Sequence, residues 1–169
     1  MNKYLPLIIS LLIFWIAISA ITFISIGQTG GIFIYTLDDP YIHMAIAKNI
    51  VTNGVWGITK SEFTSCSSSP LWTFLIPIFY FIFGVKDIIP FILNILFASL
   101  TAVFVFKVLR KFTDSITIQT IILLFVLFFT PFISVVFTGL EHTLYSFLIV
   151  TTNIYFYKIL KAQIAIKIG

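Results

Sequence analysis

The stretch LPLIISLLIFWIAISAITFISI, at residues 5–26, decides the class of fold. It carries no charged residue and matches the roughly 20 residues that a helix needs to cross the hydrocarbon core of a bilayer. A signal peptide is the alternative, because Lys3 precedes the run and Ser19 and Ala20 are small. The apolar core of a signal peptide spans only about 7–15 residues. The length therefore favours an uncleaved transmembrane helix.

The composition extends this interpretation to the whole chain. Of its 169 residues, 60% are hydrophobic and 9% are charged, against roughly 25% charged residues in a typical soluble domain. Residues 88–106, 116–137 and 143–157 form further long apolar runs, without the alternation of barrel strands. Helices satisfy their own backbone hydrogen bonds in lipid. The sequence predicts an all-α integral membrane protein with about four transmembrane helices and one N-terminal module over residues 1–169.

Residues 28–87 are more polar and form the predicted first extracytoplasmic loop. Within the loop, Asp39 can act as the N-cap of a helix at 40–53, Pro40 suits its first position and Gly54 suits its end. We expect this helix to lie along the membrane surface. Its expected apolar face consists of Ile42, Ala45, Ile46 and Ile50.

A second short apolar segment, at residues 70–83, contains Pro77 and is shorter than a span requires. If it does not cross, most basic residues fall on one side of the membrane and most acids on the other. The positive-inside rule therefore favours an interfacial helix at 70–83 that is embedded in the membrane without crossing it. It also places the N-terminus in the cytoplasm of a multi-pass protein of the plasma or inner membrane. The basic residues on the cytoplasmic side are Lys3, Lys107, Arg110, Lys111, Lys158, Lys161 and Lys167.

Three polar features share the predicted outer face: Asp38-Asp39, the loop 64–72 and the turn 139–142. Each also has an ordinary structural explanation, as a helix cap, a helix-opening loop or an inter-helix turn. Adjacent carboxylates can provide a general base, or can hold a divalent cation that steadies a phosphate leaving group. Since Asp39 is expected to cap its helix, Asp38 is freer to face a substrate and is the predicted base.

Four segments carry a resemblance to a known family. They are YTLDDPYIHMAIAKNI at 35–50, GVWG at 54–57, SSSPLW at 67–72 and TGLEHTL at 138–144. Together they resemble the N-terminal part of GT-C glycosyltransferases, namely protein O-mannosyltransferases and the aminoarabinose and arabinofuranosyl transferases. Such enzymes have a paired acidic motif in the first extracytoplasmic loop, together with membrane-surface helices.

The resemblance implies transfer of a sugar, with inversion, from a polyprenyl-phosphate carrier to an acceptor at the extracytoplasmic face of the cell envelope. By position, Asp38 and Asp39 match the catalytic paired acids, and the same two residues are the candidates for a divalent cation. Glu141 and His142 match a second-loop motif with a substrate-binding role. His43 and Lys48, on the first-loop helix, are further candidates for contacting the donor phosphate. A plain interfacial position at the membrane surface is the alternative for His43. Membrane lipid and the lipid-linked sugar are the expected partners, with no nucleic acid.

Members of that superfamily are several hundred residues long, so we expect a truncated or split gene product that is inactive alone and lacks a C-terminal part. The second hypothesis is a non-catalytic membrane protein, a transporter subunit or assembly partner, whose acidic loop binds a cation. Ion relays usually place an ionisable residue inside a span. Here no Asp, Glu, Lys, Arg or His lies inside a run, and intrusions such as Asn94 and Gln119 are uncharged, which argues against a transporter.

Overall fold

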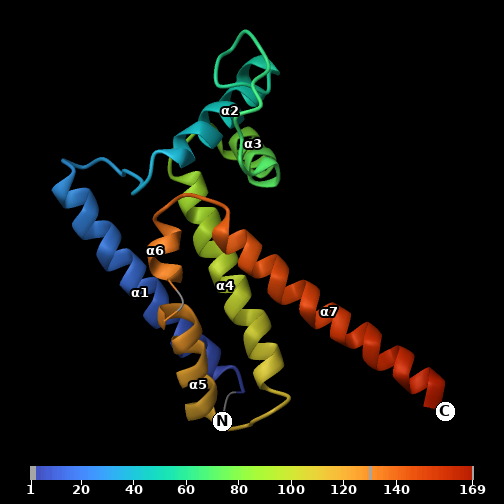
Figure 1. The fold of residues 1–169 in the computed structure, drawn as a ribbon. Helices are drawn as coiled ribbons and strands as arrows, with labels where there is room; N and C mark the ends of the chain where they lie inside the picture. The colour runs from blue at the N-terminus through green and yellow to red at the C-terminus, as the bar shows by residue number, and fades with distance from the viewer. Residues whose placement is uncertain (1–2, 130, 169) are drawn as a thin grey trace.

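A computed structural model describes residues 3–129 and 131–168, and every regular element in this part of the chain is a helix. Gly169 and the side chain of Lys167 lie outside the described part. The prediction of an all-helical fold is confirmed. The elements are α1 (Leu5–Gln28), α2 (Asp39–Asn53), α3 (Pro70–Phe83), α4 (Ile89–Leu109), α5 (Ile116–Leu124), the π-helical turn η1 (Phe125–Phe129), α6 (Phe132–Val136) and α7 (His142–Ile168) (Figure 1).

Helices α1 and α4 are long and apolar enough to cross a membrane. Their 24 and 21 residues correspond to about 36 and 32 Å of helix, against a hydrocarbon core of about 30 Å. Large apolar side chains on α1 point away from the rest of the molecule, among them Ile16 and Phe23, which is 81% exposed. Such a surface suits contact with lipid better than contact with water.

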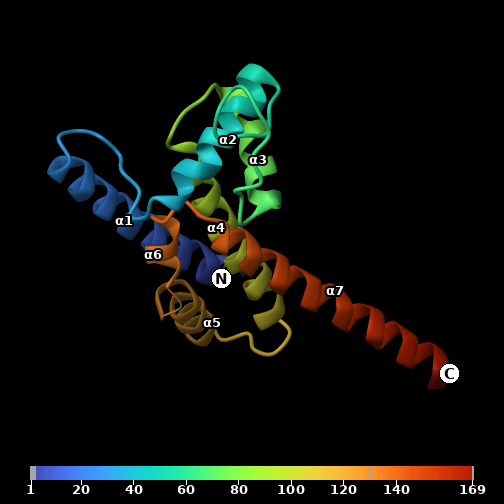
Figure 2. The same ribbon diagram turned by 45° about the horizontal axis from the view of Figure 1, so that its top comes forward.

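The long helices form an open bundle with the two short helices α2 and α3 at one end (Figures 1 and 2). The beginning of α1, the turn between α4 and α5 and the far end of α7 lie at the opposite end (Figure 1). Helix α1 packs against α5, and α4 packs against α7. The main core lies between α1, α4 and the α5–α6 segment and includes Phe14, Ile18, Ala98, Ala102, Leu123 and Leu127.

The apolar run at 116–137 does not form one continuous helix. It is divided into α5, η1 and α6, and α6 begins directly after Pro131. Proline has no backbone N–H and its ring clashes with the preceding helical turn, while π-helical turns mark interruptions of the α-helical ladder. The last predicted helix, at 143–157, is longer than expected and extends to Ile168.

Helix α2 starts one residue earlier than predicted, so Asp39 is not the N-cap. Asp38 occupies that position, without a side-chain hydrogen bond to the helix. The end at Gly54 is as expected, because Gly54 has a φ of +67° in the left-handed region. The buried face is also rotated from the predicted stripe, because α3 packs on the side that carries His43 and Ala47.

Candidate active site

Three segments that the sequence singled out meet where α2 and α3 rest on the bundle. We call this meeting point the three-segment junction, formed by residues 35–40, 67–73 and 137–143. Gly139 lies at its centre, with a φ of +71°. A Cβ atom at this position would lie 2.6 Å from the Tyr35 ring and 2.9 Å from Pro40 Cβ. Only glycine allows this approach of the 137–143 turn to the start of α2.

Trp72 joins the second segment to the third. Its side chain is fully buried, and its indole N–H donates a hydrogen bond of 3.1 Å to the carbonyl oxygen of Gly139. The first segment is joined to the same turn by a hydrogen bond of 3.3 Å from the backbone N–H of Thr36 to the carbonyl oxygen of Phe137. All three segments are therefore held together through the 137–143 turn.

Tyr35 ties the junction to the beginning of α4. Its hydroxyl donates to the carbonyl oxygen of Asp87 at 2.6 Å and accepts from the backbone N–H of Phe91 at 3.0 Å. Burial raises the pKa of Tyr35 well above its ordinary value of 10.0. The phenol therefore stays protonated and remains a hydrogen-bond donor, which holds the chain in place just before Asp38.

Asp38 and Asp39 are both exposed at the start of α2. Asp39 lies in the first helical turn, where the helix dipole favours a negative charge. Its charge also acts on His43, raising the pKa of that imidazole. Asp38 makes no capping hydrogen bond to α2. Its carboxylate is free to meet a molecule arriving from outside the protein.

His43 is not on the surface of α2 but is buried, with 2% of its area exposed. Its Nδ1 lies 2.6 Å from Thr73 Oγ1, which also lies 2.7 Å from Ser67 Oγ. The Thr73 hydroxyl also lies 3.0 Å from the carbonyl oxygen of Ser69. One shared hydroxyl therefore anchors His43 to α3 and to the loop before it, whichever ring nitrogen carries the proton.

The pKa of His43 is lowered by burial, while the carboxylates of Glu141 and Asp39 act in the opposite direction. A depressed pKa means that the folded chain resists protonation more than the unfolded chain does. This contribution to stability is complete above the ordinary value of 6.5 and is lost as the pH falls below it.

We therefore expect the melting temperature in detergent to fall as the pH is lowered below about 6.5. The variant His43→Gln should flatten that part of the profile, because it removes the titrating group. His142→Gln is the matched control, since His142 is exposed and should leave the profile unchanged. A wild-type melting temperature that did not decline on acidification would contradict this account of His43.

Two buried polar atoms near the start of α7 lack a hydrogen-bond partner: Glu141 Oε2 and Asn94 Nδ2. Asn94 is fully buried on α4, and its Oδ1 accepts a hydrogen bond of 2.5 Å from Thr143. An unsatisfied buried polar atom costs about 1–3 kcal/mol. A buried polar atom without a hydrogen-bond partner is therefore unusual, and a ligand or an ordered water molecule would supply that partner.

The predicted site residues thus fall into two groups. Glu141, in the 137–143 turn, and His43, on α2 beside Thr73, are buried, whereas Asp38, Asp39, Lys48 and His142 are exposed. Lys48 is nine residues beyond Asp39, a separation of about 13 Å along the helix axis. The structure therefore does not bring it next to the paired aspartates. His142 instead borders a small cavity of about 80 Å³ between α6 and α7.

The structure shows further residues at or beside the three-segment junction for which the sequence predicted no role. Gly139, Trp72 and Thr143 belong to the quoted motifs, but no role was predicted for them. For Asn94 the sequence offered one signal, a polar residue inside an apolar run, and that signal did not predict its contact with Thr143. In the described part of the chain, no three His, Cys, Asp or Glu side chains come together as a metal site. A divalent cation at Asp38 and Asp39 would need further ligands from a substrate phosphate.

Comparison of the chain with protein-family models, curated proteins and solved structures found no match. The geometry of the junction is therefore the basis for any functional proposal.

Proposed function

We propose that this chain is an integral membrane protein with four spans: α1, α4, the α5–α6 segment and α7. Helix α3 has 14 residues, about 21 Å of helix, which is too short for a hydrocarbon core of about 30 Å. It packs against α2 at one end of the bundle. Its exposed side chains include Phe74, Phe81 and Ile82, which suit the surface of a bilayer.

We further propose that the junction is part of the active site of a glycosyltransferase that uses a polyprenyl-phosphate-linked sugar. The observation that carries this proposal is the exposed pair Asp38 and Asp39, held by the packing of Tyr35 and Pro40 on Gly139. The start of α2, which carries this pair, lies at the end of the bundle opposite the turn after α4 (Figure 1). An exposed carboxylate on a rigid support can reach a substrate whose lipid part stays in the membrane.

In this reaction Asp38 accepts the proton of the acceptor hydroxyl as the hydroxyl oxygen attacks the anomeric carbon of the sugar. The bond between that carbon and the phosphate oxygen breaks, and the electron pair leaves with the lipid phosphate. A single displacement inverts the anomeric configuration.

The direct test uses the full-length polypeptide expressed from its own gene and reconstituted in vesicles with a radiolabelled polyprenyl-phosphate sugar. Transfer to a hydroxyl acceptor on the side of Cys66 would support the proposal. Cation-dependent flux through the same vesicles, without transfer, would instead support the non-catalytic alternative with a cation-binding acidic loop. Transfer on the side of Arg110 would contradict the placement of the site.

The orientation has its own prediction, because Cys66 is the single cysteine of the chain and is exposed between α2 and α3. In intact cells a membrane-impermeant maleimide should label Cys66 from outside. It should not label the variant Arg110→Cys in a Cys66→Ser background until the cells are opened. Labelling of both positions from one compartment would overturn the four-span arrangement.

A further inference from the structure

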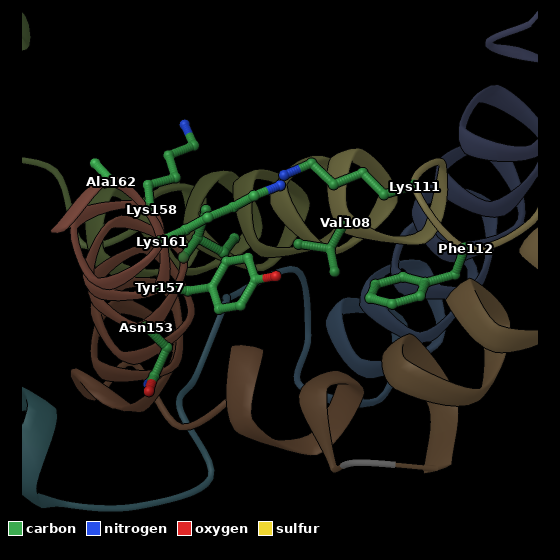
Figure 3. A pocket seen from close by; sticks show the side chains of 9 residues that line it. Val108, Lys111, Phe112, Asn153, Tyr157, Lys158, Lys161 and Ala162 are labelled. Carbon is green, nitrogen blue, oxygen red and sulfur yellow. The ribbon is translucent and has the colours of Figure 1, made fainter. Parts of the chain in front are cut away.

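A cavity of about 780 Å³ lies between the end of α4, with the turn after it, and the distal half of α7. It is far from the three-segment junction, at the other end of the bundle. Three lysines line it: Lys111, Lys158 and Lys161. In Figure 3 the Lys111 and Lys161 side chains extend from opposite walls toward one another.

The charged residues that line this cavity are all positive. None of the described residues that line it is a carboxylate. A smaller cavity of about 160 Å³ between the same two helices shares Lys111 and Lys158 and adds Lys107. Like charges that converge repel one another, and an anion placed between them removes that repulsion. The geometry therefore selects a negatively charged ligand.

The other lining residues define the rest of the ligand. Val108 and Phe112 provide apolar surface, and Tyr157 places an aromatic ring with a hydroxyl beside the lysines. A small inorganic anion would leave these apolar walls without contacts. An amphipathic anion would use both parts of the cavity, with its charged group at the lysines and its hydrocarbon on the walls.

We propose that this cavity binds the phosphodiester headgroup of an anionic phospholipid from the leaflet on the side of the N-terminus. Basic pockets between transmembrane helices on the cytoplasmic side are suited to such headgroups. The proposal depends on a membrane location but not on sugar transfer, because the cavity shares no residue with the junction.

The experiment compares lipid retention by the full chain in nanodiscs of phosphatidylcholine with and without phosphatidylglycerol, measured by native mass spectrometry after release. We expect retention of phosphatidylglycerol over phosphatidylcholine. Each lysine near a headgroup contributes about a fivefold change in affinity, so Lys111→Gln with Lys161→Gln should weaken binding about 30-fold. Arginine at both positions should restore it.

The matched control is Lys60→Gln with Lys86→Gln, two exposed lysines of the 28–87 loop, and it should leave retention unchanged. Equal retention of both lipids, or an equal loss in the control variant, would overturn the proposal. Displacement of phosphatidylglycerol by inorganic phosphate at the same concentration would also overturn it, because the site would then take free phosphate rather than a lipid headgroup.

Discussion

Replacing Asp38 with asparagine should reduce sugar transfer by a factor of about 10² to 10⁴, which is the usual contribution of a general base. Asparagine keeps the size and polarity of the side chain but cannot accept the proton of the acceptor hydroxyl. Asp38 makes no capping hydrogen bond to α2 and is exposed, so the variant should fold with an unchanged melting temperature. The measurement is the initial rate of transfer from a polyprenyl-phosphate sugar by the full-length polypeptide.

Two control variants separate the role of Asp38 from a general effect of negative charge. Glu62→Gln removes another exposed carboxylate of the same loop and should leave the rate unchanged. Asp39→Asn should have a smaller effect than Asp38→Asn, because Asp38 is the proposed base and Asp39 lies within the first turn of α2. Undiminished transfer by Asp38→Asn would exclude Asp38 as the base, and a larger loss with Asp39→Asn would move that role to its neighbour.

The second large effect is expected at Gly139, where an added methyl group should destabilise the chain by about 3 kcal/mol. Two causes combine at this position. A φ of +71° is strained for any residue with a Cβ, and that Cβ would overlap the Tyr35 ring and Pro40. The ring cannot easily move aside, because its hydroxyl is held by Asp87 and Phe91.

The measurement for Gly139→Ala is thermal unfolding in detergent micelles, followed by tryptophan fluorescence. Gly54→Ala is the control for backbone strain, since Gly54 has a φ of +67° but open space around it, and about 1 kcal/mol is expected there. Gly27 has neither a positive φ nor a close neighbour, so Gly27→Ala should not destabilise the chain. If Gly139→Ala were no worse than Gly54→Ala, the close packing of the three-segment junction would be wrong.

Gly139→Ala also links stability to the proposed activity. A shift of the 137–143 turn would displace Pro40 and with it the start of α2, where the paired aspartates lie. Transfer should therefore fall even at temperatures where the variant remains folded. A folded Gly139→Ala protein with full transfer would show that the position of the aspartates does not depend on this contact.

The sequence alone determined the helical class and the extent of most helices. An apolar run long enough for a bilayer defines α1 by its length, and Pro40 and Gly54 mark the limits of α2 to within one residue. These signals are local, because they depend on the solvation and backbone conformation of neighbouring residues. The prediction of a continuous helix at 116–137 was wrong. Pro131, a proline inside an apolar run, was a local signal of the interruption.

Only the tertiary structure decided which polar residues are exposed and which are buried. His43 becomes an interior group because α3 packs on α2, and Glu141 is buried just before α7; no spacing within either segment indicates this. The meeting of Tyr35, Trp72 and Gly139 likewise depends on contacts between residues far apart in the chain. Burial is a property of the partner surface as well as of the residue itself, so a single segment of sequence does not specify it.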